Sequence, residues 1–229
     1  MLGSGGTARR GDGMRTIGKG LGLATLLACG AAQGAQLAVD LADRQGRPVA
    51  DAVVSLVRAD GAGSAPAAGA PHVVDQKNLA FRPYVEVLRP GESVVFRNSD
   101  ATRHHVYSFS RAKSFEYVVA PRQESAPMTL PRAGVVAVGC NIHDGMISYL
   151  YVTDAPWSAR SDARGHVVLD GLPAGTYEVR VWHPRLPPTK QEIAQPGVVL
   201  GADDHRRLPF ALALLPDPRR AVDRERTGY

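Results

Sequence analysis

The sequence predicts an all-β protein built from β-sandwich units. Short segments of alternating or β-branched apolar residues recur along the chain, with turn residues between them. No segment keeps the 3.6-residue periodicity of an amphipathic helix. Glycine and proline supply 24 and 17 of the 229 residues, which suits many turns without indicating a low-complexity chain. A chain of this length can bury one or two hydrophobic cores.

The predicted strands form an early, a central and a late group. The early group comprises residues 36–41 and 52–57, and the flexible sequence of residues 60–71 is expected to be a linker. The central group comprises residues 73–76, 84–88, 93–97, 105–109, 134–139 and 147–152. The late group comprises two strands within residues 161–184, joined by a Gly-Leu-Pro-Ala-Gly turn, and a last strand at 208–214. The arginine-rich residues 216–229 are expected to be a flexible tail.

Residues 1–35 have the pattern of a secretory signal peptide. Basic residues up to Lys19 precede the apolar run of residues 21–29, and small residues at Ala32-Gln33-Gly34 offer a cleavage site. The apolar run is too short to span a bilayer well, so we expect export to the periplasm. An uncleaved anchor and a lipid-modified Cys29 are the alternatives, and they are the only route by which we expect a membrane to be involved. Much of the formal charge of +5 lies in this segment, and nucleic-acid binding is not expected.

The cysteine count gives the sharpest indication of function. The chain has two cysteines, and Cys29 lies within the expected signal peptide. The exported protein would therefore carry one thiol, Cys140, in a compartment where free thiols are open to oxidation. Ligation of a metal ion would protect this thiol, whereas the alternative is an inert buried cysteine.

The residues around Cys140 favour ligation. Cys140, His143 and Met146 are spaced three apart, directly after the apolar run of residues 134–138. Another imidazole is available upstream, from either His104 or His105. Two imidazoles, one thiolate and a weak axial thioether form the blue-copper electron-transfer site. Adjacent strand residues face opposite ways, so only one of the two neighbouring histidines can point at the metal.

Residues 72–153 resemble the cupredoxins of the plastocyanin and amicyanin type. The matching residues are Phe81-x-Pro83, the stretch Pro90–Asn98, Asp100, and Cys140-x-x-His143-x-x-Met146, whose spacing is similar to the shorter ligand loop of amicyanin. The wider stretch is similar to proteins labelled as methylamine-utilisation proteins. The resemblance implies a Greek-key cupredoxin β-sandwich at residues 71–153 that holds one type 1 copper ion.

The resemblance also implies a choice between the two upstream histidines. In the cupredoxin pattern the ligand histidine precedes an asparagine and a valine, which maps the ligand to His104. The implied ligand set is then His104, Cys140, His143 and Met146. His105 replaces the asparagine that braces the ligand loop in that family, and it is expected to support the site or to serve as an alternative ligand.

Residues 36–58 and 158–184 resemble the two halves of a carboxypeptidase-regulatory-like (transthyretin-like) β-sandwich. The matching features are the turn Asp43–Pro48 in the first half and the Leu-Pro-Ala-Gly-Thr-Tyr sequence that ends at Tyr177 in the second. We therefore expect a discontinuous small sandwich, residues 36–60 and 154–215, that carries the cupredoxin-like segment as an insertion. Two tandem sandwiches, or one enlarged sandwich, are the alternatives. Trp182 and Tyr177 are expected in the core of the small sandwich.

The sequence predicts an electron carrier and no enzyme. It has no Gly-x-Ser-x-Gly elbow and no His-Glu-x-x-His motif, and a copper ion with its ligands filled leaves no open position for a substrate. We therefore expect no catalytic residues, no cofactor besides copper, no small-molecule substrate, and a redox protein as partner. The alternatives are a copper-handling or copper-sensing protein and a β-sandwich binding module with a vestigial metal site. The remaining histidines are expected at surface or turn positions: His72, His166, His183 and His205.

Overall fold

The computed structural model describes residues 34–63 and 69–221, and in this part of the chain the structure is all-β. The prediction of an all-β sandwich protein is confirmed. The expected signal peptide falls almost wholly on residues 1–33 and part of the expected linker on residues 64–68, so both lie outside the described residues. Among the described residues, no helix has the length and apolar character needed to cross a bilayer.

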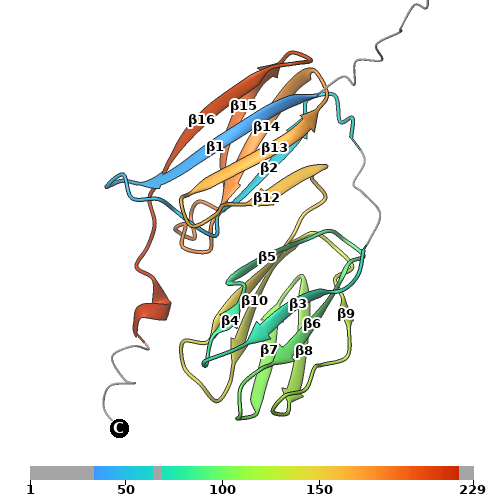
Figure 1. Ribbon diagram of the computed structural model, residues 1–229, viewed down its shortest axis with the longest axis vertical. Coiled ribbons are helices and arrows are strands. Elements are labelled where there is room, and N and C mark those ends of the chain that lie inside the picture. The colour runs from blue at the N-terminus through green and yellow to red at the C-terminus, as the bar shows by residue number, and fades with distance from the viewer. Residues whose placement is uncertain (1–33, 64–68, 222–229) are drawn as a thin grey trace, which may run out of the picture. The chain divides into compact units, whose positions relative to one another are not determined.

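The first sandwich is formed by both ends of the described chain (Figure 1). Its three-stranded sheet has the order β13-β1-β16, with β13 at His166–Leu172, β1 at Ala35–Asp43 and β16 at His205–Leu212. Its four-stranded sheet has the order β12-β2-β14-β15, with β12 at Trp157–Arg160, β2 at Val53–Arg58, β14 at Gly175–Trp182 and β15 at Ile193–Leu200.

The core of the first sandwich follows from the two-residue period of its strands. In β1, Leu37, Val39 and Leu41 point inward while the residues between them are partly exposed. They pack in one cluster with Leu56 and Tyr177, whose hydroxyl donates a hydrogen bond to the Pro173 carbonyl. Each such buried aliphatic side chain contributes about 1.5–3 kcal/mol of transfer free energy. Tyr177 therefore lies where the sequence predicts it.

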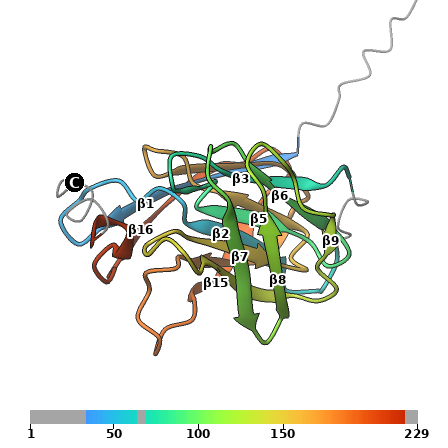
Figure 2. The same cartoon turned by 90° about the horizontal axis from the view of Figure 1, so that it is seen from below.

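The second sandwich takes all of its strands from residues 72–152. Its five-stranded sheet has the order β5-β11-β10-β7-β8, with β5 at Val85–Leu88, β11 at Ile147–Val152, β10 at Gly134–Cys140, β7 at His104–Ser110 and β8 at Lys113–Val119. Its four-stranded sheet has the order β4-β3-β6-β9, with β4 at Phe81–Arg82, β3 at His72–Gln76, β6 at Ser93–Asn98 and β9 at Met128–Thr129. Figure 2 shows β7 and β8 side by side as an antiparallel hairpin.

A third cluster of buried residues joins side chains from the strands of both sandwiches. It contains Val53 of β2, Trp182 of β14, and Tyr84 and Tyr151 from the second sandwich. The ring of Trp182 lies 4.9 Å from that of Tyr151, centroid to centroid. The sequence predicts Trp182 in the core of the first sandwich. That prediction is wrong, because the Trp182 ring packs outside that core cluster, against Tyr151 of the second sandwich. The described residues of both sandwiches belong to one compact unit by backbone contacts.

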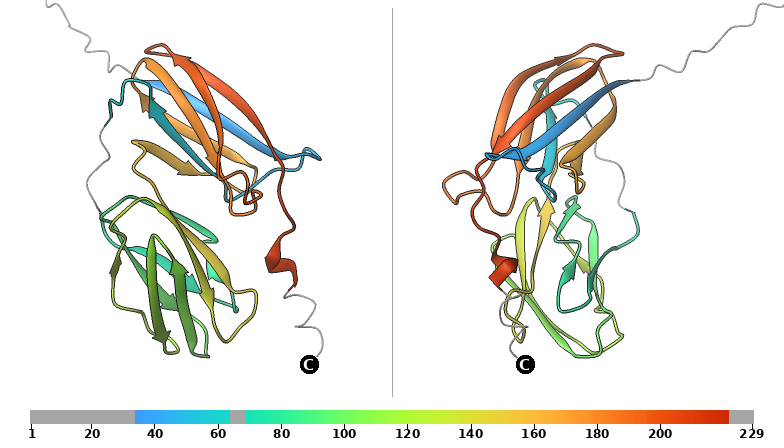
Figure 3. Two further views of the ribbon diagram at one scale, coloured as in Figure 1. Left: turned by 180° about the vertical axis from the view of Figure 1, so that it is seen from behind. Right: turned by 60° about the vertical axis from the view of Figure 1, so that its left-hand side comes forward.

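The segment after β16 contains a short helical turn (Figure 3). A 3-10 turn, η1, spans Pro218–Ala221, and the Arg219 guanidinium forms an ion pair with Asp217 at 2.7 Å. The same guanidinium lies 3.6 Å from the centre of the Tyr84 ring, which is the geometry of a cation–π contact. The beginning of the expected flexible tail is thus anchored through Arg219, and residues 222–229 lie outside the described residues.

His183, which follows β14 in a turn, is buried rather than exposed. Only 3% of its surface is accessible, and its Nδ1 accepts a hydrogen bond of 3.0 Å from the backbone N–H of Arg185. Burial lowers the pKa of His183 to about 4, and the nearby positive charge of Arg185 acts in the same direction. The ring is therefore neutral in the folded protein over most of the pH range.

We expect the free energy of unfolding to fall as the pH falls from about 6.5 to about 4, by up to about 3 kcal/mol from this residue. The unfolded chain gains the His183 proton first, because the folded pKa is depressed. In His183→Asn the amide oxygen replaces Nδ1 as acceptor without titrating, so this part of the pH dependence should disappear. Urea unfolding across this pH window measures the difference, and an unchanged profile in the variant would contradict it.

Candidate metal centre

Two adjacent strands bring the first two candidate ligands to the same side of the sheet. In β7, His104, Val106 and Ser108 face inward, and in β10, Val138 and Cys140 face inward. The antiparallel register pairs Cys140 with Val106. His104 lies two residues from that pair on the same face, which is the diagonal neighbour position of an antiparallel ladder. Strand period and register together place His104 beside Cys140.

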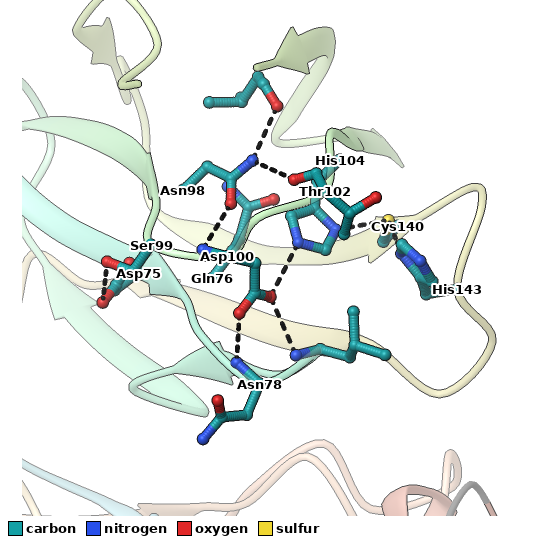
Figure 4. Close-up of polar contacts among 12 residues, drawn as sticks. Asp75, Gln76, Asn78, Asn98, Ser99, Asp100, Thr102, His104, Cys140 and His143 are labelled. Carbon is teal, nitrogen blue, oxygen red and sulfur yellow. Dashed lines mark hydrogen bonds and ion pairs between the residues drawn. The ribbon is translucent and has the colours of Figure 1, made fainter. Parts of the chain in front are cut away.

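The third candidate ligand, His143, comes from the loop that follows β10. The Sγ atom of Cys140 lies 3.7 Å from Nδ1 of His104 and 3.7 Å from Nδ1 of His143. Potential ligand atoms of the three residues all lie within 4.8 Å of one another. Figure 4 shows the two rings on either side of the sulfur. The structure therefore brings together the donor atoms of three of the four residues predicted as ligands.

The two sulfur–nitrogen distances fit a shared metal ion. First-row ions such as zinc bind a thiolate at about 2.3 Å and an imidazole at about 2.0 Å, so at angles of about 110–120° the sulfur lies about 3.5–3.7 Å from each nitrogen. A thiol has one proton and can donate it to only one of two ring nitrogens at a time. An ion between the donors satisfies all three at once. A thiolate with two imidazoles is the donor set that favours copper in a trigonal site.

The three residues differ in how deeply they are buried. His104 is fully buried, Cys140 is 7% exposed, and His143 is partly exposed. Among the described residues Cys140 is the free cysteine, and it belongs to the core cluster of the second sandwich. The group thus lies just beneath the surface, and the His143 ring reaches outward.

A short loop returns the chain from Cys140 to Met146. The backbone N–H of Met146 donates to the His143 carbonyl at 3.3 Å, and that of Cys140 donates to the Met146 carbonyl at 3.2 Å. Gly145 takes a φ of +76° in this turn, a conformation that glycine adopts without strain. Met146 is 2% exposed and belongs to the same core cluster as Cys140. Its role as axial ligand stays a prediction.

His105 points away from the other three residues. Its Nε2 lies 2.6 Å from a Glu116 oxygen on β8, and its Nδ1 lies 3.4 Å from the Asn141 amide nitrogen. The His105 carbonyl also accepts a hydrogen bond of 3.0 Å from the Asn141 backbone N–H. These contacts tie the start of the Cys140–Met146 loop to β7. The geometry suits the supporting role that the sequence predicts for His105 and is unsuited to a ligand role.

Asp100 orients the His104 ring. Its Oδ2 lies 3.0 Å from His104 Nε2, the ring nitrogen that faces away from Cys140 (Figure 4). The carboxylate also accepts the backbone N–H groups of Asn78 at 2.6 Å and Leu79 at 3.0 Å. Burial alone would raise the pKa of Asp100, but these N–H donors and His104 hold it below its ordinary value. An ionised Asp100 fixes the proton on Nε2 and leaves Nδ1 free to bind a metal.

Asn98 holds the loop that carries Asp100. Its amide nitrogen donates to the carbonyls of Thr102, Val119 and Ala120, and its side-chain oxygen accepts the Asp100 backbone N–H at 3.0 Å. Asn98 is 1% exposed, so these bonds are made away from solvent. In the sequence, Asp100 and Asn98 stand out only as matches to a family pattern. The i, i+4 spacing of Asp100 and His104 is the signal that could have indicated their contact.

Comparison with known proteins gives only distant similarities. No protein-family model and no curated protein matches this sequence. Solved structures with a similar fold include a mutant of amicyanin in its reduced state, at 18% identity and a TM-score of 0.34, covering 43% of this chain and 99% of that one. A second amicyanin mutant, in its oxidised state, has 19% identity, a TM-score of 0.34, and coverage of 45% and 99%. A purple cupredoxin from Nitrosopumilus maritimus has 15% identity, a TM-score of 0.32, and coverage of 36% and 99%.

We expect Asp100→Ala to lower the affinity for a divalent metal about 10–100-fold, which is the usual cost of removing a carboxylate that orients a ligating histidine. Cobalt(II) titration followed by absorbance measures the affinity without any redox step. Asp144→Asn, which removes an exposed carboxylate beside His143, is the matched control. Equal affinity in Asp100→Ala and the control would contradict this role, and urea unfolding of the metal-free variants separates loss of orientation from loss of folding.

Proposed function

We propose that this chain is a mononuclear type 1 copper protein that carries single electrons between redox partner proteins. The observation that supports it best is the convergence of one thiol and two imidazole Nδ1 atoms beneath the surface of a β-sandwich. In this proposal His104, Cys140 and His143 hold the copper ion, and Met146 is the weak axial ligand. The bound copper supplies the one-electron couple.

The surrounding residues keep the ligand positions fixed. Two of the proposed ligands end or begin strands of a five-stranded sheet, and Cys140 and Met146 are packed into its core. Asp100 holds the His104 ring, while Asn141 is tied to His105. A site held this firmly changes little in geometry when its charge changes, and a small rearrangement favours fast electron transfer. His143, the partly exposed member, offers the shortest route to a partner.

The proposal includes a cellular location and excludes catalysis. The predicted signal peptide supports export to the periplasm. With four protein ligands the copper ion would have no open position for a substrate, so the protein would be a carrier and have no enzymatic activity. The first sandwich would then serve as a scaffold with the carboxypeptidase-regulatory-like fold that the sequence predicts.

The visible and EPR spectra of the Cu(II)-loaded protein test the proposal. We expect an intense thiolate-to-copper charge-transfer band in the red region, and complete loss of this band in Cys140→Ser. Since Cys140 contacts both imidazoles, the serine variant should also bind copper more weakly. Met128→Leu, a change in a core residue of the same sandwich with no metal role, is the control and should keep the band.

Two results would count against an electron carrier. A colourless protein whose EPR spectrum is that of loosely held surface copper would show that the three donors do not act together. Tight binding of Cu(I) without a stable Cu(II) form would instead indicate a copper-handling protein.

A further inference from the structure

Four loops of the second sandwich meet around the His104–Cys140–His143 group. The backbone N–H of Ser99, between β6 and β7, donates to Gln76 at the end of β3 at 2.9 Å. The Arg122 guanidinium, between β8 and β9, donates to the Ser99 carbonyl at 2.6 Å. Asn141, after β10, is bonded to His105 as described above. Residues 77–80, 99–103, 120–123 and 141–145 therefore form one end of the sandwich, here called the ligand end.

The ligand end carries an excess of unpaired positive charge. Its exposed cationic residues are Lys77, Arg82, Arg103 and Arg122, and none of them forms an ion pair with another described residue. Arg82 belongs here because it lines one hollow together with Gly145 of the ligand loop. The acidic residues are mostly engaged, since Asp100 bonds to His104, Glu116 bonds to His105, and Asp75 accepts a hydrogen bond from the Ser99 hydroxyl. Asp144 is the exposed acid of these loops.

An exposed apolar spot lies among these charges. Ile142 is 45% exposed and Val118 is 69% exposed. Both line a hollow of about 130 Å³ together with Arg103, His104 and His105. The hollow lies beside His104, which is itself fully buried, and it has room for one small side chain. An apolar centre with a polar rim is the usual anatomy of a protein–protein interface.

Charge alone does not single out this end. Arg111 and Arg132 are exposed at the opposite end of the sandwich, where the Arg132 guanidinium donates to the Ala112 carbonyl in the turn between β7 and β8. Phe109, 82% exposed, also gives the opposite end an apolar side chain. What distinguishes the ligand end is that its cationic rim and aliphatic spot lie beside the donor group. A phosphate backbone offers nothing apolar to fill the hollow, whereas an aliphatic side chain of a protein does.

We propose that the ligand end docks a partner protein through an acidic patch with an aliphatic side chain at its centre. The inference rests on the proposed function in one respect, namely that this partner is the redox partner. The cationic rim steers the acidic surface toward His143, and the Ile142–Val118 spot supplies the apolar contact once the two surfaces meet. Docking at this end brings the partner close to His143, so the electron route through His143 is short.

Peptide probes test the surface on the full chain without added metal, so no result depends on copper. The probe is the peptide Glu-Asp-Leu-Asp-Glu, followed by backbone NMR shifts. We expect saturable shifts at the amides of Arg103, Val118 and Ile142 that weaken with added salt. A peptide with serine in place of leucine should bind more weakly, and Lys-Lys-Leu-Lys-Lys should not bind. Arg103→Glu should weaken binding about tenfold, since a like charge replaces an attraction, whereas the matched change Arg111→Glu should leave it unaltered.

Four results would overturn the proposal. Shifts that centre on Arg111 and Arg132, or equal binding of the basic peptide, would show that the ligand end is not an acidic docking surface. Absence of saturable shifts would do the same. The fourth result is that the chain sediments with phosphatidylglycerol vesicles, loses this sedimentation in Arg103→Glu, and binds no peptide. That result would indicate an anionic lipid surface as the partner instead of a protein. If the chain binds the acidic peptide specifically but gives no type 1 copper spectrum, the docking surface is supported and only the electron-carrier role is contradicted.

Discussion

The register between β7 and β10 is the constraint on which the rest of the candidate centre depends. Pairing Cys140 with Val106 puts His104 on the same inward face as the thiol, and a slip of one residue would turn His104 outward. The inward faces of both strands are buried in the core of the second sandwich, with Val106, Val136 and Val138. A one-residue slip would expose those valines, so the hydrophobic core fixes the same register that brings the donors together.

Backbone geometry reinforces this arrangement at some cost. Asn78 and Leu79 both have positive φ, near +55°, so their successive N–H groups point toward the same carboxylate. Leu79 in this conformation costs on the order of 1 kcal/mol, because its Cβ crowds the backbone. The bonds to Asp100 offset that cost. The loop between β3 and β4 is thereby connected through Asp100 to His104, and Asn98 closes the same network from β6.

The sequence predicts most strands of the fold because the pattern of each strand is local, whereas the approach of His104 to Cys140 depends on strand register. Alternation predicts β1, short apolar or β-branched runs between turns predict β6, β7, β10 and β11, and the spacing of Cys140 and His143 predicts that they meet. The prediction omits β15, because Pro196 and Gly197 resemble a turn, whereas here they form a bulge at which Gly197 takes a φ of +75°. It also omits β8, although Phe115, Tyr117 and Val119 alternate with more exposed residues.

Contacts between distant segments could not be predicted from the sequence. Nothing near Trp182 indicates that its ring packs on Tyr151 instead of entering the core cluster around Tyr177. The burial of His183 and the stacking of Arg219 on Tyr84 likewise depend on segments far away in the chain. The role of Asp100 requires the Asn78–Leu79 backbone to be in place. In each case the partner is set by tertiary packing, which one segment's pattern does not contain.

X-ray absorption at the copper edge, in both oxidation states, tests the central claim most directly. One sulfur lies 3.7 Å from each of two imidazole nitrogens, so we predict one short copper–sulfur bond and two copper–nitrogen bonds. We also predict that these bond lengths change little on reduction, because the ligands are held by a buried core, by Asp100 and by the loop bonds. A first coordination shell of oxygen and nitrogen without sulfur, or a loss of nitrogen ligands on reduction, would contradict this claim.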